Sequence, residues 1–246
     1  MSISSGDYPH LMSHWTLVVP VKGTSGSKSR LGASHELAMA IALDTVEIAL
    51  QIAHVVVVTA PSASAAFHSL GATVVADPGG GLTAAIQAGL SSLNCDAIGG
   101  ESRSAQGSFR VGAAGASLSP QATGEAIVGS VGVLLGDLPA LTAVELRSAL
   151  TMAQSLPLAF VPDHEMQGTT LVTATALAHA NSAGSAEFAA VPGPAFGANS
   201  RQAHLDLGYV ELAIPSSWGL RRDVDTPKQL ASLTHLGPRT SALVSR

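Results

Sequence analysis

Three cations lie close together in a chain that is poor in charge. Only 12% of the residues are charged, well below the ~25% typical of soluble proteins. Even so, Lys22, Lys28 and Arg30 fall within nine positions, in a loop rich in glycine and serine. Cationic side chains and free backbone N–H groups can together neutralise a polyphosphate. The segment therefore predicts a phosphate-binding loop, and a solvated basic loop is the alternative.

A second group of candidate residues is acidic. Asp137 follows an apolar run, at a position where a carboxylate is costly to bury unless it binds a cation. Asp223 and Asp225 follow another strand-like piece and precede a helix that starts at Pro227. Carboxylates from distant strands can hold Mg²⁺ against the phosphates of a nucleoside triphosphate. We expect such a magnesium site here, with a turn-capping role as the alternative for Asp137.

Three further segments combine glycine or hydroxyl groups with the start of an element. Residues 77–81 open a helix and would let a ligand approach the backbone. Residues 167–171 and 196–200 could hold a phosphate or a carboxylate. Each segment alone could also be an ordinary turn at the end of a strand or helix. The candidates are Gly79, Gly80, Gly81 and Thr83 in the first segment, Thr169 and Thr170 in the second, and Gly197 and Ser200 in the third.

Strands and helices alternate around these segments. Apolar and β-branched runs predict strands at 16–21, 55–59, 73–76, 126–135, 158–161, 169–174 and 209–214. Helical spacing predicts helices at 35–53, 61–70, 82–93 and 142–154, and one from Pro227. Such alternation predicts an α/β fold with one mostly parallel, doubly wound sheet and flanking helices. Ligands bind at the carboxyl ends of the strands in such sheets.

Length and composition limit the domain organisation and the class of partner. We expect one domain at residues 15–236, with tails at 1–14 and 237–246 and a Gly- and Ser-rich insertion at about 99–125. The net charge of −5 disfavours nucleic acid as a partner. The chain has neither a long apolar run nor a signal-peptide pattern, which favours a cytoplasmic protein without a membrane segment. The sequence does not indicate an oligomer.

Several common chemistries lack their sequence signatures. Cys95 is the single cysteine, so an intramolecular disulfide and a thiolate metal cage are excluded. No Gly-x-Ser-x-Gly elbow and no zinc-type His spacing occur. No Gly-x-Gly-x-x-Gly follows the first strand, which disfavours an NAD-dependent oxidoreductase.

The motifs also occur in a characteristic order along the chain. The basic loop with Lys22, Lys28 and Arg30 comes first, followed by GDLPAL at 136–141, GTT at 168–170, the segment 196–208 and RRDVDTP at 221–227. In this combination the chain resembles the guanylyltransferases of coenzyme F-420 biosynthesis, which activate 2-phospholactate or phosphoenolpyruvate with GTP. The resemblance covers nearly the whole chain except the tails and the insertion. It implies a single Rossmann-like domain of the glycosyltransferase-A type, similar to molybdenum-cofactor nucleotidyltransferases.

The resemblance also implies roles for individual residues. Lys22, Lys28 and Arg30 would lie along the triphosphate, and Asp137, Asp223 and Asp225 would hold Mg²⁺. The glycine loop would meet the nucleoside, although the family usually has Asn where this chain has Thr83. The acceptor, a small phosphorylated three-carbon acid, would meet residues 169–170, 197 and 200. A sugar-phosphate or molybdopterin nucleotidyltransferase and a non-catalytic GTP-binding regulator remain as alternatives.

Overall fold

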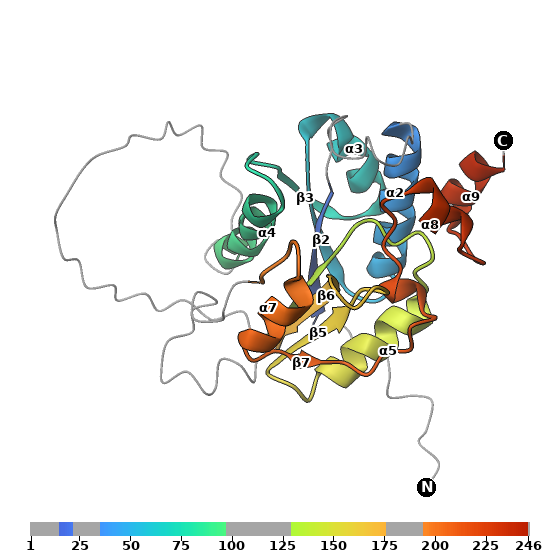
Figure 1. Ribbon diagram of the computed structural model, residues 1–246. Helices are drawn as coiled ribbons and strands as arrows, with labels where there is room; N and C mark the ends of the chain where they lie inside the picture. Colours follow the sequence, from blue (N-terminus) through green and yellow to red (C-terminus); the bar gives the residue numbers. More distant parts are fainter. Residues whose placement is uncertain (1–14, 22–34, 97–128, 176–193, 246) are drawn as a thin grey trace, which may run out of the picture.

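The computed structural model describes residues 15–21, 35–96, 129–175 and 194–245. In these parts of the chain, seven strands form one sheet in the order β3-β2-β1-β4-β6-β5-β7, and helices flank it (Figure 1). The strands are β1 (Trp15–Pro20), β2 (His54–Thr59), β3 (Thr73–Ala76), β4 (Ser130–Leu134), β5 (Leu158–Pro162), β6 (Thr169–Ala174) and β7 (Val210–Glu211). The predicted α/β fold with a mostly parallel sheet is confirmed.

One strand runs against the others. Neighbouring strands among β1, β2, β3 and β4 are parallel, and so are β5 and β7. In contrast, β6 lies between β4 and β5 and is antiparallel to both. The physical reason is the short turn between β5 and β6, since a parallel neighbour needs a crossover connection of a dozen or more residues.

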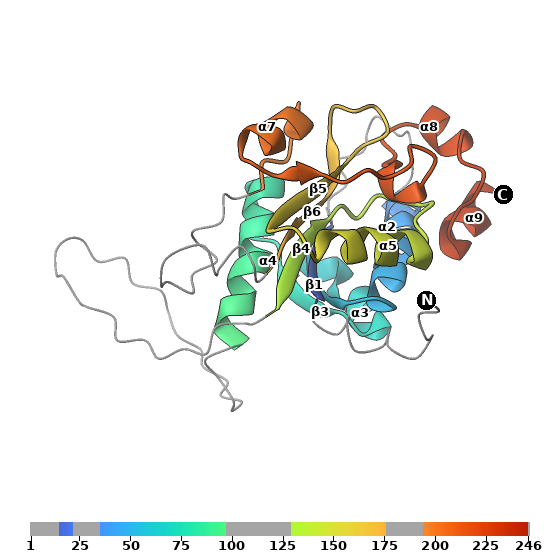
Figure 2. The same cartoon turned by 90° about the horizontal axis from the view of Figure 1, so that it is seen from below.

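Helices cover both faces of the sheet (Figure 2). The described helices are α2 (His35–Leu50), α3 (Pro61–Leu70), α4 (Leu82–Asp96), α5 (Ala143–Ala153), α7 (Ser200–Asp206), α8 (Pro227–Ala231) and α9 (Pro238–Val244), with a 3₁₀ turn, η4 (Gly219–Arg221). On β1, Val18 packs with Ile86 of α4. Its neighbours Leu17 and Val19 face the opposite core, which also contains residues of α2, α3 and α5. Strands buried on both faces explain the unbroken apolar runs of the sequence.

Local signals set several helix ends where the sequence predicts them. Gly71 ends α3 with φ 96°, a conformation that favours glycine. Thr142 caps α5 in a capping box with Glu145, because its Oγ1 accepts the Glu145 N–H and its own N–H donates to that carboxylate. Thr226 forms the same box with Gln229 at the start of α8.

The structure departs from the predicted elements at the C-terminal side. The expected strand 209–214 is reduced to Val210–Glu211, since Ile214 turns back to bond Leu212. Residues 237–246, expected to be a tail, contain α9, which packs against α2. The expected insertion at 99–125 and the basic residues Lys22, Lys28 and Arg30 lie outside the described residues. Among the described helices, none has the length and apolar character needed to span a membrane.

Candidate active site

One edge of the sheet collects the candidate residues that the structure describes. The parallel strands β1 to β5 end at this edge, and the antiparallel β6 begins there. Residue Thr170 at the start of β6 therefore lies beside the end of β4, where its carbonyl accepts the N–H of Leu135 at 2.9 Å. Val21, the residue before Lys22, packs against Gly136 so closely that a side chain at Gly136 would lie 3.1 Å from it. Asp137 is thus placed where the ends of β1, β4 and β6 meet.

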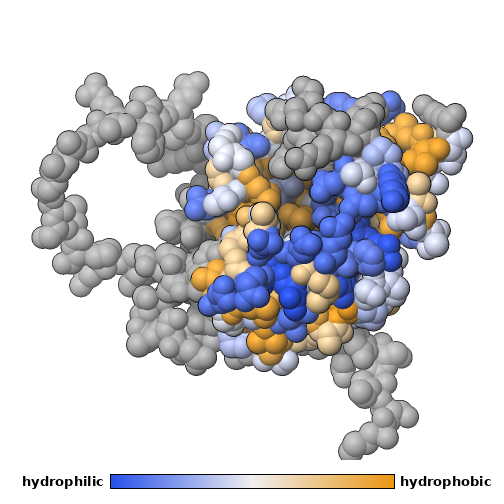
Figure 3. Space-filling model, in the orientation of Figure 1, coloured by the Kyte–Doolittle hydropathy of each residue, from blue (hydrophilic) through white to orange (hydrophobic). Residues whose placement is uncertain are grey.

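The acidic candidates come together at this edge. Val224 donates its N–H to the carbonyl of Asp137 at 3.2 Å, which joins the two segments that carry Asp137 and Asp223. The pKa of Asp223 is raised from 3.8 to about 7, mainly by burial and in addition by the negative charges of Asp137, Asp163 and Asp225. In the view of Figure 1, hydrophilic residues gather over the centre of the molecule around β5 and β6 (Figure 3).

The donor set fits a magnesium ion that is shared with phosphates. Within the described ranges, no group of three His, Cys, Asp or Glu residues is placed to hold a metal ion alone. Mg²⁺ is usually held by one or two carboxylates together with phosphate oxygens and waters. Asp137 and Asp223 supply such a pair, and the pKa of Asp223 is raised first by burial and then by neighbouring negative charge, which a cation would neutralise. Asp225 is exposed at the rim of the cluster.

The glycine loop has a backbone that other residues would find strained. Gly79, Gly80 and Gly81 have φ angles of 78°, 86° and 90° and are all exposed. Asp77 fixes the loop, because its Oδ1 accepts the N–H of Gly79 at 2.9 Å and its own N–H donates to Thr59 at the end of β2. The loop therefore leads from the same sheet edge into α4, and only glycine adopts three such φ angles at little cost.

The predicted acceptor residues lie close together, but most of their polar atoms are already bonded. Thr169 and Ser200 are 3% and 2% exposed, and the Ser200 hydroxyl donates to Thr169 Oγ1 at 3.2 Å. Gly197 is exposed with φ 137°. Thr170 is fully buried, and its Oγ1 has no hydrogen-bond partner among the described residues. The hydroxyls of Thr169 and Ser200 therefore hold the loop in place through their hydrogen bond. The hydroxyl of Thr170 has no such partner among the described residues.

Curated relatives identify the family. No protein-family model matches the chain. The phosphoenolpyruvate guanylyltransferase of Streptosporangium roseum is 39% identical, over 95% of this chain and 92% of that protein. The enzyme of the same name from Streptomyces coelicolor is 40% identical, over 94% and 96%. A third, from Thermomonospora curvata, is 37% identical, over 94% and 89%. The chain belongs to the phosphoenolpyruvate guanylyltransferase family.

A solved structure shows that this guanylyltransferase family member has a known fold. A protein of Desulfovibrio desulfuricans, described among nucleotide-diphospho-sugar transferases, aligns over 95% of both chains with a TM-score of 0.53 and 14% identity. At this identity the likeness concerns the fold alone. It agrees with the Rossmann-like domain that the sequence resemblance implies.

Asp163 and Arg221 have structural roles in this guanylyltransferase that were not predicted from its sequence. Asp163 shapes the turn between β5 and β6, since its two carboxylate oxygens accept the N–H groups of Gln167 and Gly168 at 2.9 and 2.7 Å. Arg221 is buried and donates to the carbonyls of Pro162, Ile214 and Asp163 at 2.8 to 3.1 Å. The arginine thereby holds the segment before Asp223 against this turn. An acidic residue five positions before a glycine in a short turn is the signal that could have found Asp163.

His204 is the third residue without a predicted role in this guanylyltransferase. It is fully buried among Phe160, Phe196 and Tyr209, with ring centroids 5.2 to 5.6 Å apart. Its Nε2 accepts the N–H of Ala195 at 3.0 Å, so Nδ1 carries the proton and donates to Thr169 Oγ1 at 3.0 Å. Burial lowers the pKa of His204 to about 4, and the ring is therefore neutral. Phe196 and Tyr209 lie close to His204 in the sequence, but the packing of Phe160 from β5 against the ring left no signal in the sequence.

Proposed function

We propose that this chain transfers GMP from GTP to phosphoenolpyruvate with release of pyrophosphate, a cytoplasmic step in coenzyme F-420 biosynthesis. The relatives named above carry this activity in their names and align along almost the whole chain. The structural observation that carries the proposal is the pair of carboxylates, Asp137 and Asp223, beside the start of β6. A site of this charge suits a metal-bound triphosphate.

The reaction joins two anions. An oxygen of the acceptor phosphate attacks the α-phosphorus of GTP, a new phosphoanhydride bond forms, and the bond to pyrophosphate breaks. No general base is needed, because the attacking phosphate is already ionised at neutral pH. Catalysis therefore consists of orientation and neutralisation of charge. When bound, Mg²⁺ would supply positive charge at the phosphates.

The proposed residue roles follow the geometry. Asp137 and Asp223 hold the ion, with Asp225 at the exposed rim. Thr170 offers its buried hydroxyl to the acceptor, and Thr169 and Ser200 keep the loop of Gly197 in place. The backbone of the glycine loop meets the nucleotide. The remaining proposed contacts are Lys22, Lys28 and Arg30 along the triphosphate and Thr83 beside the nucleoside.

The acceptor is the finer part of the proposal. Phosphoenolpyruvate is favoured over 2-phospholactate because the relatives described above are named for it. Both acids present a phosphate and a carboxylate at similar spacing. The residues at the start of β6 therefore suit either of them.

The experiment is a pyrophosphate-release assay with GTP and one acceptor at a time. Phosphoenolpyruvate, 2-phospholactate, 3-phosphoglycerate and glucose 1-phosphate are compared with and without Mg²⁺, and Asp137→Asn serves as the inactive control. We expect release with phosphoenolpyruvate, dependent on Mg²⁺. Release with the sugar phosphate alone would assign a different transferase. GTP binding without release under any condition would assign a regulator.

A further inference from the structure

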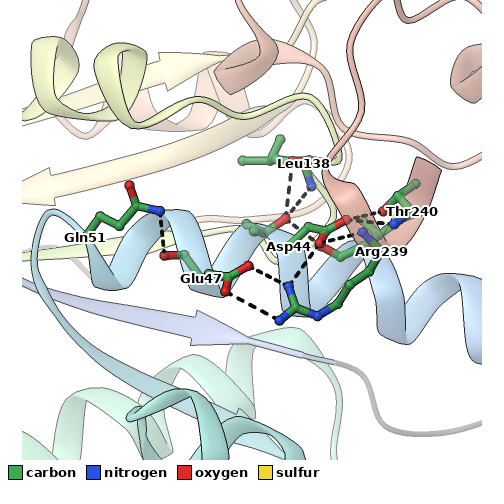
Figure 4. A network of polar contacts seen from close by, with 8 residues as sticks. Asp44, Glu47, Gln51, Leu138, Arg239 and Thr240 are labelled. Carbon is green, nitrogen blue, oxygen red and sulfur yellow. Dashed lines mark hydrogen bonds and ion pairs between the residues drawn. The ribbon is translucent and has the colours of Figure 1, made fainter. Parts of the chain in front are cut away.

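A buried carboxylate fastens the C-terminal helix to α2 (Figure 4). Asp44 of α2 is 3% exposed, and its Oδ2 accepts the N–H and the hydroxyl of Thr240, both at 2.8 Å. Its Oδ1 accepts the backbone and side-chain N–H groups of Arg239, both at 3.2 Å. Gly237 packs so tightly on this carboxylate that any side chain there would collide with it. The start of α9 therefore has one fixed position on α2.

The next residue of α2 reaches the loop that carries Asp137. Thr45 is 1% exposed, and its hydroxyl donates its single hydrogen to the carbonyl of Ile41 at 2.9 Å, with the carbonyl of Leu138 as a second, more distant acceptor at 3.3 Å. The same oxygen accepts the N–H of Leu138 at 3.3 Å. Gly237 donates its N–H to the carbonyl of Pro139 at 2.8 Å. The two residues after Asp137 are therefore held from α2 and from the segment that leads into α9.

A hydroxyl in this core needs a reason, because valine has the same shape and its burial carries no polar cost. Its contacts with both polar backbone atoms of Leu138 give that reason. We propose that Thr45, together with the Asp44-anchored start of α9, is a positioning element that sets where the Asp137 carboxylate stands relative to Asp223. The inference rests on the proposed function, since it concerns the magnesium pair of that site.

The test compares Thr45→Val with Thr45→Ser and with Thr151→Val. Thr151 on α5 is the matched control, because its hydroxyl also donates to the carbonyl four residues earlier, that of Arg147 at 2.9 Å, and the structure gives it no further hydrogen bond. Three quantities are measured: the Mg²⁺ concentration for half-maximal pyrophosphate release, Mn²⁺ binding by electron paramagnetic resonance in the presence of a non-hydrolysable GTP analogue, and amide hydrogen exchange at Leu138.

A positioning role changes metal binding more than the reaction at saturating metal. We expect Thr45→Val to need about threefold to tenfold more Mg²⁺ and to weaken Mn²⁺ binding to a similar extent, as the loss of modest hydrogen bonds implies. The kcat at saturating Mg²⁺ should stay within about twofold, and exchange at Leu138 should quicken. Thr45→Ser restores the hydroxyl and should restore wild-type values, whereas Thr151→Val should match wild type throughout.

Two results would overturn the proposal. If Thr45→Val lowers only the unfolding midpoint while its metal binding equals that of Thr151→Val, Thr45 serves folding alone. If Thr45→Val does not fold, Thr240→Val tests the α9 contact instead, and unchanged Mn²⁺ binding there contradicts the proposal. Should wild-type protein release no pyrophosphate, the proposed function fails, but Mn²⁺ binding and exchange at Leu138 still decide the role of Thr45.

Discussion

The two ends of the candidate site are stabilised in opposite ways. At the carboxylate end, Asp223 is partly buried near other negative charges, and its pKa is raised by that burial first and by those charges second. At the hydroxyl end, His204 is a neutral ring whose two nitrogens are both bonded, inside an aromatic cage. The first end would gain from a cation, whereas at the second end the His204 ring is already fully bonded and the Thr170 hydroxyl alone lacks a partner among the described site residues. Under the proposed function, positive charge would be supplied with the nucleotide, and the acceptor would meet a surface that is already ordered.

The largest expected effect is on the carboxylate end. Asp137→Asn keeps the shape of the side chain and removes the charge that would hold Mg²⁺. We expect turnover to fall about a hundredfold to a thousandfold, the scale of losing a group that stabilises charge in the transition state. Steady-state pyrophosphate release at saturating substrates measures it. Turnover within about threefold of wild type would remove Asp137 from the site.

The hydroxyl end should respond to acid. The folded pKa of His204 is about 4 and lies below 6.5, so the unfolded chain binds the proton first as pH falls. Its contribution to stability is therefore complete above pH 6.5 and is lost toward pH 4, by up to about 3 kcal/mol. Urea unfolding across this range measures it. His204→Gln should lack this pH-dependent part, and the exposed His68→Gln should keep it.

The carboxylate end should respond in the opposite direction. The pKa of Asp223 is raised from 3.8 to about 7, so between these values the folded protein holds a proton that the unfolded chain has lost. Stability in metal-free buffer should therefore fall as pH rises through this window, by about 2 kcal/mol after allowance for partial exposure. Asp223→Asn should flatten this slope, and the exposed Asp206→Asn should not. An unchanged slope in Asp223→Asn would contradict the proposed field.

Variants of two hydroxyl residues at the acceptor end should distinguish binding of the acceptor from stability of the loop. Thr170 Oγ1 has no partner among the described residues, so Thr170→Val should leave stability unchanged and lower kcat/KM for phosphoenolpyruvate about tenfold. Ser200→Ala removes the bond to Thr169 and should lower stability by about 1 kcal/mol. Thermal unfolding and steady-state kinetics measure the pair. Unchanged kinetics in Thr170→Val would exclude its hydroxyl from the acceptor site.

The smallest effect is expected at the glycine loop. Gly80 has φ 86°, and a Cβ there would lie 3.3 Å from Ala84. Gly80→Ala should cost about 1 kcal/mol of stability and raise KM for GTP about threefold. Gly71→Ala is the matched control, because Gly71 has φ 96° at the end of α3 and is not part of the loop. Equal effects of both variants on KM for GTP would remove the loop from nucleotide binding.

Much of the parallel half of the sheet could be predicted because its signals are local. A mostly apolar run marks β1, an unbroken β-branched run marks β2, and Gly71 and Thr142 mark helix ends through their own chemistry. The sequence did not reveal how α9 docks, because Asp44 binds a partner 195 positions away. Asp137 could be singled out as a carboxylate that follows a strand, whereas the strand expected before Asp223 is the 3₁₀ turn η4 in the structure. The role of His204 depends on rings brought together from three segments, which no spacing along the chain reveals.

The antiparallel orientation of β6 has a consequence for the order in which the protein folds. It forms a hairpin with β5 across a short turn, so this pair closes at little entropic cost and should form early. Strand β4, in contrast, must find β1 far earlier in the chain before Asp137 reaches its place. We expect the hydroxyl end to be assembled while the carboxylate end is still open. Under the proposed function, a magnesium nucleotide that binds only the finished sheet would stabilise the folded state by mass action.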